Sequence, residues 1–396
     1  MARIWNKHKQ INASLKPHIS LLPQYHGKAG YGARRGRQKV FVGMSGGVDS
    51  SVTALLLKEK GYEVIGAFIK GWDGLAINDG LKFRDQCRWR DDQRDAIRVA
   101  AGLKIPFITY DFTKDYGEHV VEYFFKESEA GRTPNPDIMC NKEIKFKIFL
   151  AQAIRDGADY MATGHYARIS YNNGVYKLLA GSDESKDQSY FLYTLGQREL
   201  AKTLFPLGEL KKSEVRALAL KHGLVTACKP DSQGICFIGD ISIVDFLKAR
   251  IPTNIGAVIT VDGRAIGEHD GVPYYTIGQR HGLRLSSRLP YYIVEKDIVN
   301  NVIRVAEGND DDTLYKKMVT AISLSWVESA PRVGSQLTAK IRYRQPPQPL
   351  TIAGAANNSI DSPWVFEFHQ AQRAVTPGQS IVLYNGDEVI GGGIIT

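Results

Sequence analysis

A glycine-rich loop at residues 43–50 combines residue types that suit phosphate chemistry. Its sequence is Gly-Met-Ser-Gly-Gly-Val-Asp-Ser, and it lies between the apolar run 40–42 and a helical pattern. Glycines accept positive φ and leave room for a phosphate, while serine hydroxyls and the N–H groups of a helix start donate hydrogen bonds. A Walker A loop ends in Gly-Lys-Ser/Thr, whereas this loop carries Asp49, which we expect to handle magnesium. The loop predicts a pyrophosphate cradle; the alternative is a glycine turn that only joins a strand to a helix.

Cys140 is the first of two cysteines in polar loops. It ends the proline-stiffened segment 131–140, and the helix-forming residues 143–147 follow it. A thiol at a helix N-terminus beside Lys142 has a lowered pKa and acts as a thiolate nucleophile. Asp137 is close enough in sequence to serve as an acid or base. The alternative for Cys140 is a buried structural cysteine.

Cys236 lies in the second loop of this kind, at 229–239. Two reactive thiols indicate sulfur handling or a redox pair. The sequence lacks the closely spaced Cys or His pairs that structural zinc sites need. It leaves open an iron–sulfur cluster held by Cys140, Cys236 and a third ligand. We interpret Cys87 and Cys228 as structural or incidental.

Length and composition indicate a multidomain protein of a reducing compartment. A chain of 396 residues with 43% hydrophobic residues predicts two or three packed domains. No stretch approaches the ~20 apolar residues of a membrane helix, so we expect no membrane partner. Four cysteines are too few for a disulfide scaffold, which favours the cytoplasm.

The net charge of +9 is concentrated in the first residues. Residues 1–39 contain nine Lys or Arg and no Asp or Glu. The glycines and prolines of the arm 1–38 predict disorder. Three interpretations stay open for it: a grip on nucleic-acid phosphates, a mitochondrial targeting segment, or a solubilising tail or misassigned start.

The pattern from 39 to 205 predicts a doubly wound parallel α/β sheet, the domain that contains the glycine-rich loop. Glycines stand at expected helix C-caps, namely Gly61, Gly102 and Gly157. Because a doubly wound sheet binds ligands at the carboxyl ends of its strands, the loops after 43, 69, 110 and 162 are expected to share one crevice. The expected strands are 40–43, 64–69, 106–110 and 159–162, and the expected helices are 91–103 and 143–156.

The sequence pattern of the remaining residues changes twice. Residues 206–312 predict a middle domain that is helical up to about 250 and then forms short strands, including 257–261, 291–295 and 301–305. Residues 313–396 repeat short strands with Pro and Gly turns, which is typical of a small β-barrel.

Several segments together closely resemble the tRNA-specific 2-thiouridylases, members of the PP-loop ATP pyrophosphatase superfamily. The resemblance runs in order from residue 40 to the C-terminus. Its segments are the loop at 43–50 and residues 131–147, 162–166, 185–191, 231–239, 278–280, 342–344 and 376–379. It implies a HUP-type catalytic domain followed by a mixed middle domain and a tRNA-contacting C-terminal barrel.

The resemblance assigns binding roles to residues along the chain. The residues implied to bind ATP are Gly43, Met44, Ser45, Gly46, Gly47, Val48, Asp49, Ser50, Ile69 and Gly164. The residues implied to contact the tRNA, the first three at the target base, are Asn135, Pro136, Asp137, His165, Lys186, Asp187, Gln188, Arg342, Tyr343 and Gln379. Basic side chains suit phosphates, while Tyr, His and Gln can stack on or hydrogen-bond to an unstacked base.

The resemblance also implies a mechanism. ATP adenylates the C2 oxygen of the wobble uridine and releases pyrophosphate. Cys236 accepts sulfur as a persulfide from a donor protein, a cysteine desulfurase or relay, and that sulfur reaches C2 either directly or after release as hydrosulfide. Cys140 then cleaves the persulfide, which leaves a transient Cys140–Cys236 disulfide, and Asp137 moves the proton. The target base has to be flipped out of the anticodon stack.

Two other functions fit parts of the sequence. An amidating PP-loop ligase would use the ATP site with ammonia or an amine and would not need Cys140 or Cys236. A non-catalytic tRNA-binding protein would need neither the loop nor the thiols, although the intact loop at 43–50 counts against it.

Overall fold

The computed structural model describes residues 36–72, 89–231, 242–283, 285, 289–355 and 362–396. Nearly all of the basic arm, together with Cys87 and Cys236, lies outside the described residues, so the expectations for them stay predictions. Within the described ranges, no helix combines the length and apolar character that crossing a membrane requires.

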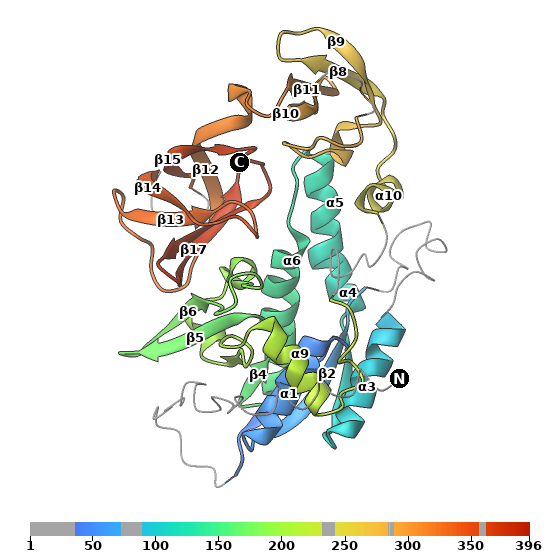
Figure 1. The fold of residues 1–396 in the computed structure, drawn as a ribbon, viewed down its shortest axis with the longest axis vertical. Helices are drawn as coiled ribbons and strands as arrows, with labels where there is room; N and C mark the ends of the chain where they lie inside the picture. Colours follow the sequence, from blue (N-terminus) through green and yellow to red (C-terminus); the bar gives the residue numbers. More distant parts are fainter. Residues whose placement is uncertain (1–35, 73–88, 232–241, 284, 286–288, 356–361) are drawn as a thin grey trace, which may run out of the picture. The chain divides into compact units, whose positions relative to one another are not determined.

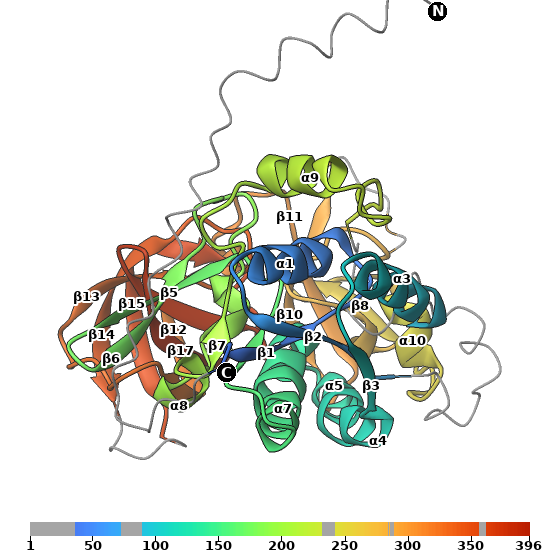
Figure 2. The same cartoon turned by 90° about the horizontal axis from the view of Figure 1, so that it is seen from below.

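The first part of the chain is a parallel sheet with helices on both faces, which confirms the predicted doubly wound class. Its strands are β1 (Lys39–Gly43), β2 (Glu63–Lys70), β3 (Phe107–Asp111), β4 (Tyr160–Ala162) and β7 (Thr203–Leu204). They lie in the order β3-β2-β1-β4-β7. In Figure 2, α1 (Val48–Glu59) and α3 (Trp89–Gly102) lie on one face, and α4 (Thr113–Tyr116) and α7 (Leu150–Arg155) on the other. The central strand β1 is buried from Val40 to Val42, as a strand covered on both faces must be.

Two long helical stretches contain π-helical segments. The first stretch is α4, the π-helical Gly117–Val121 and α5 (Glu122–Glu129); the second is α6 (Pro136–Met139), the π-helical Cys140–Phe149 and α7. The sequence pattern places the start of the second stretch near residue 143. It begins instead at Pro136, because the Asn135 side chain accepts a hydrogen bond from the Ile138 N–H at 3.3 Å and caps the helix.

Two of the three predicted glycine caps are confirmed. Gly61 and Gly157 follow α1 and α7 with φ of 86° and 89°. Gly102 is instead the last residue of α3, and Lys104, with φ of 52°, takes the left-handed conformation after it.

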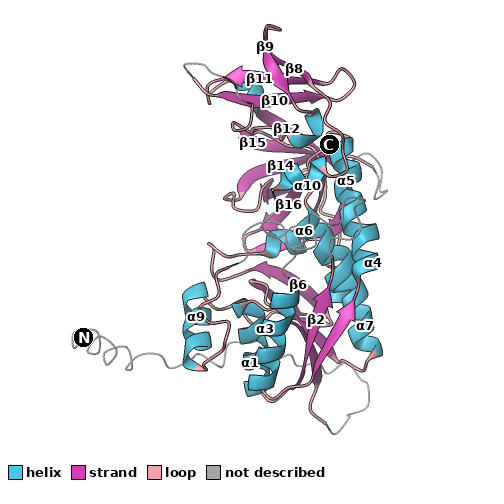
Figure 3. Ribbon diagram, turned by 90° about the vertical axis from the view of Figure 1, so that its right-hand side faces the viewer, coloured by secondary structure: helices cyan, strands magenta, loops and turns pink. Residues whose placement is uncertain are grey.

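The middle of the chain contains short helices and a small sheet. The helices are α8 (Gln197–Leu200), α9 (Lys212–Lys221) and α10 (Ile243–Lys248). Figure 3 shows α9 beside α1, against which it packs. The strands β8 (Gly256–Thr260), β9 (Ala265–His269), β10 (Tyr291–Asp297) and β11 (Val302–Glu307) form a sheet in the order β10-β11-β8-β9. The predicted short strands of this region are therefore present.

The last part of the chain forms the predicted barrel, drawn in orange to red in Figure 1. Its strands are β12 (Tyr315–Trp326), β13 (Gln336–Lys340), β14 (Gln348–Ala355), β15 (Trp364–Arg373), β16 (Ser380–Asn385) and β17 (Glu388–Ile395). Pairing of β12 with β17 closes it around an apolar core. A hairpin from the catalytic part, β5 (Ala167–Asn172) and β6 (Val175–Ala180), extends this sheet because β6 pairs with β17.

Candidate active site

The glycine-rich loop connects β1 to α1 at the carboxyl edge of the parallel sheet. Gly46 has φ of 73°, and a Cβ there would lie 2.2 Å from the Asp92 carbonyl oxygen, so only glycine fits. The Ser50 hydroxyl accepts a hydrogen bond from the Ser45 N–H at 3.2 Å and thereby holds the turn. Gly47 precedes α1 and provides no side-chain cap. The first N–H groups of α1 are therefore suited to an anion.

The loop after β4 meets the start of α1, as predicted. A Cβ on Gly164 would lie 2.9 Å from the Asp49 carbonyl carbon and the Ser50 nitrogen. Strand β1 lies between β2 and β4, where the strand order reverses, which is the ligand-binding position of a doubly wound sheet. Ile69 lies near the carboxyl end of β2 and is half-buried.

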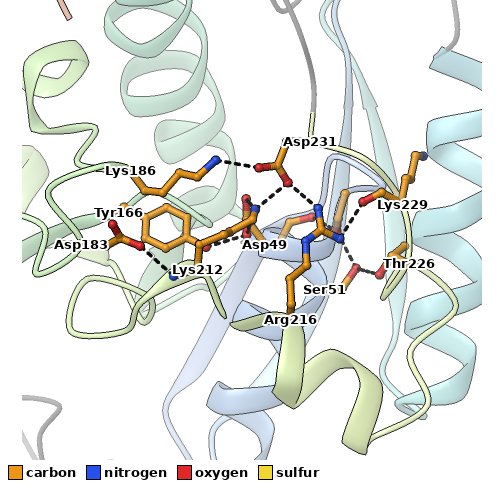
Figure 4. A network of polar contacts seen from close by, with 12 residues as sticks. Asp49, Ser51, Tyr166, Asp183, Lys186, Lys212, Arg216, Thr226, Lys229 and Asp231 are labelled. Atoms are coloured by element: carbon orange, nitrogen blue, oxygen red, sulfur yellow. Dashed lines mark hydrogen bonds and ion pairs between the residues drawn. The ribbon is translucent and has the colours of Figure 1, made fainter. Parts of the chain in front are cut away.

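Lys212, the first residue of α9, contacts the carboxylate of the loop (Figure 4). Its Nζ lies 2.7 and 2.8 Å from the two Asp49 carboxylate oxygens and 2.9 Å from Asp231 Oδ1. The Tyr166 hydroxyl donates to Asp49 Oδ1 at 2.8 Å. The Lys212 side chain is only 13% exposed. This places a positive charge beside the anion cradle, from a residue that sequence reasoning missed.

The Asp231 carboxylate contacts three cationic side chains and so connects Lys212 with Lys186. It accepts hydrogen bonds from Lys186 Nζ at 2.8 Å and Arg216 Nη2 at 2.6 Å, besides its contact with Lys212 (Figure 4). Burial raises the pKa of Asp231, but the hydrogen bonds from Lys186 and Lys212 outweigh it and hold the pKa below its usual range. Lys186, assigned to the tRNA by resemblance, therefore belongs to the network around the glycine-rich loop.

Asp49 is the residue of this loop with the chemistry of a magnesium ligand. Magnesium in nucleotide sites is bound by one or two carboxylates together with substrate phosphates. Because Lys212 spans both oxygens of Asp49, a metal ion on this carboxylate would replace that lysine. The donor set fits the ion, and the magnesium role of Asp49 stays a prediction.

The loop that precedes Cys140 is held by two other parts of the chain. The Thr133 N–H donates to the Pro377 carbonyl at 2.8 Å, and Gln379 Nε2 donates to the Thr133 carbonyl at 2.8 Å. The Thr133 hydroxyl donates to the Thr276 hydroxyl at 3.4 Å. Segments of the catalytic, middle and barrel regions thus meet at one point, which we call the three-loop junction (Thr133, Thr276 and residues 377–379).

Cys140 lies within a helix and is 3% exposed. The predicted position at a helix N-terminus is wrong, because the helix begins at Pro136. The influence of the helix dipole is concentrated in the first turn, so the dipole contributes less to the thiol than the sequence suggested. Asp137 lies about one helical turn before Cys140, and Asn135 caps the same helix two residues after Thr133 of the three-loop junction.

Three of the predicted tRNA-contacting residues are buried, namely Pro136 and the two polar residues His165 and Asp187. The His165 side chain is 8% exposed, with Nδ1 2.7 Å from the Thr163 hydroxyl. Burial, and secondarily Lys145, lower its pKa well below the usual value, so the ring is neutral. Asp187 accepts hydrogen bonds from the N–H groups of Gly181 and Ser189 and from Lys340 Nζ, each at 3.0 Å. Both side chains have structural partners here.

The other predicted tRNA contacts are distributed between two regions. Gln188 accepts a hydrogen bond from the Tyr166 N–H at 3.0 Å. The ring of Tyr343, between β13 and β14, lies 4.4 Å from that of Phe191. Arg342 and Gln379 lie on the barrel side of the three-loop junction. Gln379 therefore binds Thr133, two residues before Asn135, while Lys186 lies by the glycine-rich loop.

A parallel sheet with a Ser-Gly-Gly-Val-Asp-Ser loop at its switch point defines the PP-loop class of ATP-using α/β enzymes. Family profiles match in order: the tRNA methyl transferase HUP domain at residues 38–240, its PRC-barrel domain at 244–307, and an aminomethyltransferase β-barrel domain at 316–395. These three profiles cover nearly all of the described chain.

Curated relatives narrow the class to one family. The chain is 49% identical over 359 residues to tRNA-specific 2-thiouridylase MnmA 2 of Geobacillus kaustophilus, covering 90% of this chain and 94% of that one. It is 46% identical over 361 residues to tRNA-specific 2-thiouridylase MnmA of Alkaliphilus oremlandii, covering 90% and 96%. The chain belongs to the tRNA-specific 2-thiouridylase family, a family of sulfurtransferases.

Solved structures share less with this chain. A 4-thiouridine synthetase in complex with RNA and ATP is 17% identical, covers 54% of this chain and 50% of its own, and superposes with a TM-score of 0.34.

Proposed function

We propose that this protein uses ATP to replace the C2 oxygen of the wobble uridine of a tRNA with sulfur. The observation that carries the proposal is the glycine-rich loop at the switch point with Lys212 against its carboxylate, in a chain nearly half identical to named 2-thiouridylases. The proposed site of action is the cytoplasm, or the mitochondrion if the arm 1–38 is a targeting segment.

In the first step the uridine C2 oxygen attacks the α-phosphorus of ATP. A bond forms between that oxygen and phosphorus, and the bond to the bridging oxygen breaks, so that pyrophosphate leaves with the electron pair. The N–H groups at the start of α1 and the Lys212 ammonium would stabilise the charge on the leaving pyrophosphate. A magnesium ion on Asp49 would supply further positive charge to the phosphates.

In the second step a protein persulfide on Cys236 supplies the sulfur. The Cys140 thiolate attacks the Cys236 sulfur, the persulfide bond breaks, and the terminal sulfur leaves as hydrosulfide. Hydrosulfide adds to C2 and AMP departs with the former C2 oxygen, while the Cys140–Cys236 disulfide awaits a thiol reductant. Asp137 would move the proton. Adenylation turns the C2 oxygen into a good leaving group, so the ATP-dependent step has to precede the transfer of sulfur.

Reconstitution with purified components tests the proposal. The full chain is incubated with a wobble-uridine tRNA, ATP, cysteine and a cysteine desulfurase, and the nucleosides are analysed. We expect one 2-thiouridine per AMP, lost in C140S and C236S. It should be retained in C228S, because we interpret the exposed Cys228 as incidental.

Two outcomes would favour the other functions. Release of AMP with incorporation of ammonia and intact activity in both cysteine variants would indicate an amidating ligase. Binding of tRNA without any AMP would indicate a non-catalytic RNA-binding protein.

A further inference from the structure

Two arginines meet on the barrel side of the three-loop junction. Arg342 Nη2 donates to the carbonyl oxygens of Arg373 and Ala374 at 2.9 and 2.6 Å. A Cβ on Gly278 would lie 3.7 Å from Arg373 Nη1 and 3.9 Å from Arg342 Nη2. Both guanidinium groups therefore border the same glycine, which belongs to the loop of the middle region.

The positive charges of Arg342 and Arg373 are not balanced by acidic side chains among the described residues. Arg373 Nε and Nη2 are buried and donate no hydrogen bond within the described part of the chain. None of the ion pairs found among the described residues includes either arginine. The guanidinium of Arg373 lies 4.7 Å from the centroid of the Tyr292 ring, which holds it without supplying a negative charge. Buried donors without acceptors are costly, so this pair is suited to an anion.

Arg342 is the solvent-exposed member of the pair, and the positive charges of the two arginines repel each other. Arg342 is an exposed residue, so solvent reaches its side of the site. Partial burial, and next the charge of Arg373, lower the pKa of the Arg342 guanidinium. An anion between the two groups would relieve that repulsion. Two planar guanidinium forks match the oxygens of a phosphate better than a single point charge does.

The location relates this pair to the proposed target base. Gly278 follows Thr276, whose hydroxyl meets that of Thr133, and Thr133 precedes Asn135 by two residues. Gln379 lies five residues after Ala374 and binds the Thr133 carbonyl. The arginine pair therefore lies beside the loop proposed to receive the uridine.

We propose that Arg342 and Arg373 together bind one phosphodiester of the tRNA adjacent to the target nucleotide and so fix the register of the uridine over the loop at 133–137. The proposal rests on the proposed function for the identity of the RNA. Arg373 becomes an RNA-binding residue, and Tyr292 positions its guanidinium. Phosphate contacts set the register of a nucleic acid, while neighbouring residues read the base.

The first test compares R373Q with R332Q, which removes an exposed arginine elsewhere on the barrel. Binding of the full chain to tRNA is measured over a range of salt concentrations. We expect R373Q to bind about tenfold more weakly, with a salt slope smaller by about one. R332Q is expected to behave like wild type. In R342Q/R373Q the losses should be less than multiplicative, since both residues contact one phosphate.

The second test uses the wild-type protein, so it does not depend on a variant that folds. Neutral methylphosphonate linkages replace single phosphodiesters of an anticodon stem-loop, one position at a time. We expect one linkage next to the target uridine to weaken wild-type binding about tenfold and to weaken R373Q binding much less, because only Arg342 then remains to contact that phosphate.

The outcomes separate this proposal from the proposed function. If no linkage shows that pattern, or if R373Q weakens only the use of the sulfur donor protein, the phosphate site is refuted while thiolation stands. If the pattern appears but no 2-thiouridine forms in the reconstituted reaction, the proposed chemistry fails and the phosphate site stands.

Discussion

Replacing Lys212 with methionine removes the cation nearest the glycine-rich loop. Its Nζ contacts both Asp49 oxygens and Asp231 within 2.9 Å, which is where charge on pyrophosphate would develop. Loss of one positioned electrostatic partner of a transition state costs about 10²–10³ in kcat, or about 2.7–4 kcal/mol. We expect K212M to lose that factor in tRNA-dependent formation of AMP, with little change in the KM for tRNA because Lys212 does not lie at the three-loop junction.

The assay follows AMP from ATP labelled at the α-phosphate in a single turnover. The fold is expected to persist, since Asp231 keeps Lys186 and Arg216 and Asp49 keeps the Tyr166 hydroxyl. K211M, which removes an exposed neighbour, is the matched control and is expected to keep the wild-type rate. K212R retains the charge and should recover part of the loss. Wild-type AMP formation by K212M, or an equal loss in K211M, would refute the role.

Three further predictions follow from single contacts. G46A should abolish adenylation while leaving tRNA binding intact, because its Cβ would lie 2.2 Å from the Asp92 carbonyl oxygen; ATP-dependent AMP release and tRNA binding, measured in parallel, check this. The pKa of His165 is depressed in the folded state, so below pH 6.5 only the unfolded chain takes up a proton on this residue. The contribution of neutral His165 to the free energy of unfolding is therefore complete above pH 6.5 and falls by up to about 1.4 kcal/mol per pH unit below it. Urea unfolding between pH 7 and pH 5 should therefore be less pH-dependent in H165Q, and an unchanged slope would contradict the assignment. D187A should lose about 3–5 kcal/mol of stability, because it leaves Lys340, 12% exposed, without its buried partner. Urea unfolding followed by the fluorescence of the barrel tryptophans measures this loss. If Asp187 only contacted RNA, the urea midpoint of D187A would equal that of the wild type.

Local patterns explain the parts of the fold that the sequence predicts well. The strand at 40–43 is an uninterrupted apolar run, and the glycine-rich loop follows it without a gap, so neighbouring residues alone determine both. The start of the second helical stretch depends on a side-chain cap by Asn135, which lies between Pro134 and the first helical residue, Pro136. Gly102 fails as a cap because the left-handed residue is Lys104, a type that seldom adopts this conformation.

Long-range contacts explain what the sequence does not show. Lys212 lies 163 residues from Asp49 in the chain, and as the second of two lysines at a helix start it resembles a solvated surface charge. Lys186 and Asp187 are adjacent, yet one reaches the network around Asp231 and the other pairs with the barrel through Lys340. Only the packing of α9 on α1 and of the β5–β6 hairpin on β17 decides these partners.

Through the three-loop junction, the barrel holds the loop that precedes the helix of Cys140. Both main-chain groups of Thr133 are bound from the barrel, the N–H by Pro377 and the carbonyl by Gln379. Gly378 between them has φ of 91°, and a Cβ there would lie 2.8 Å from the Thr133 nitrogen, so the close approach requires glycine. The loop before α6 is therefore fixed to the barrel through both main-chain groups of Thr133. The orientation of Asn135 and Asp137, and through the same helix of Cys140, therefore depends on a barrel that begins 175 residues later in the chain.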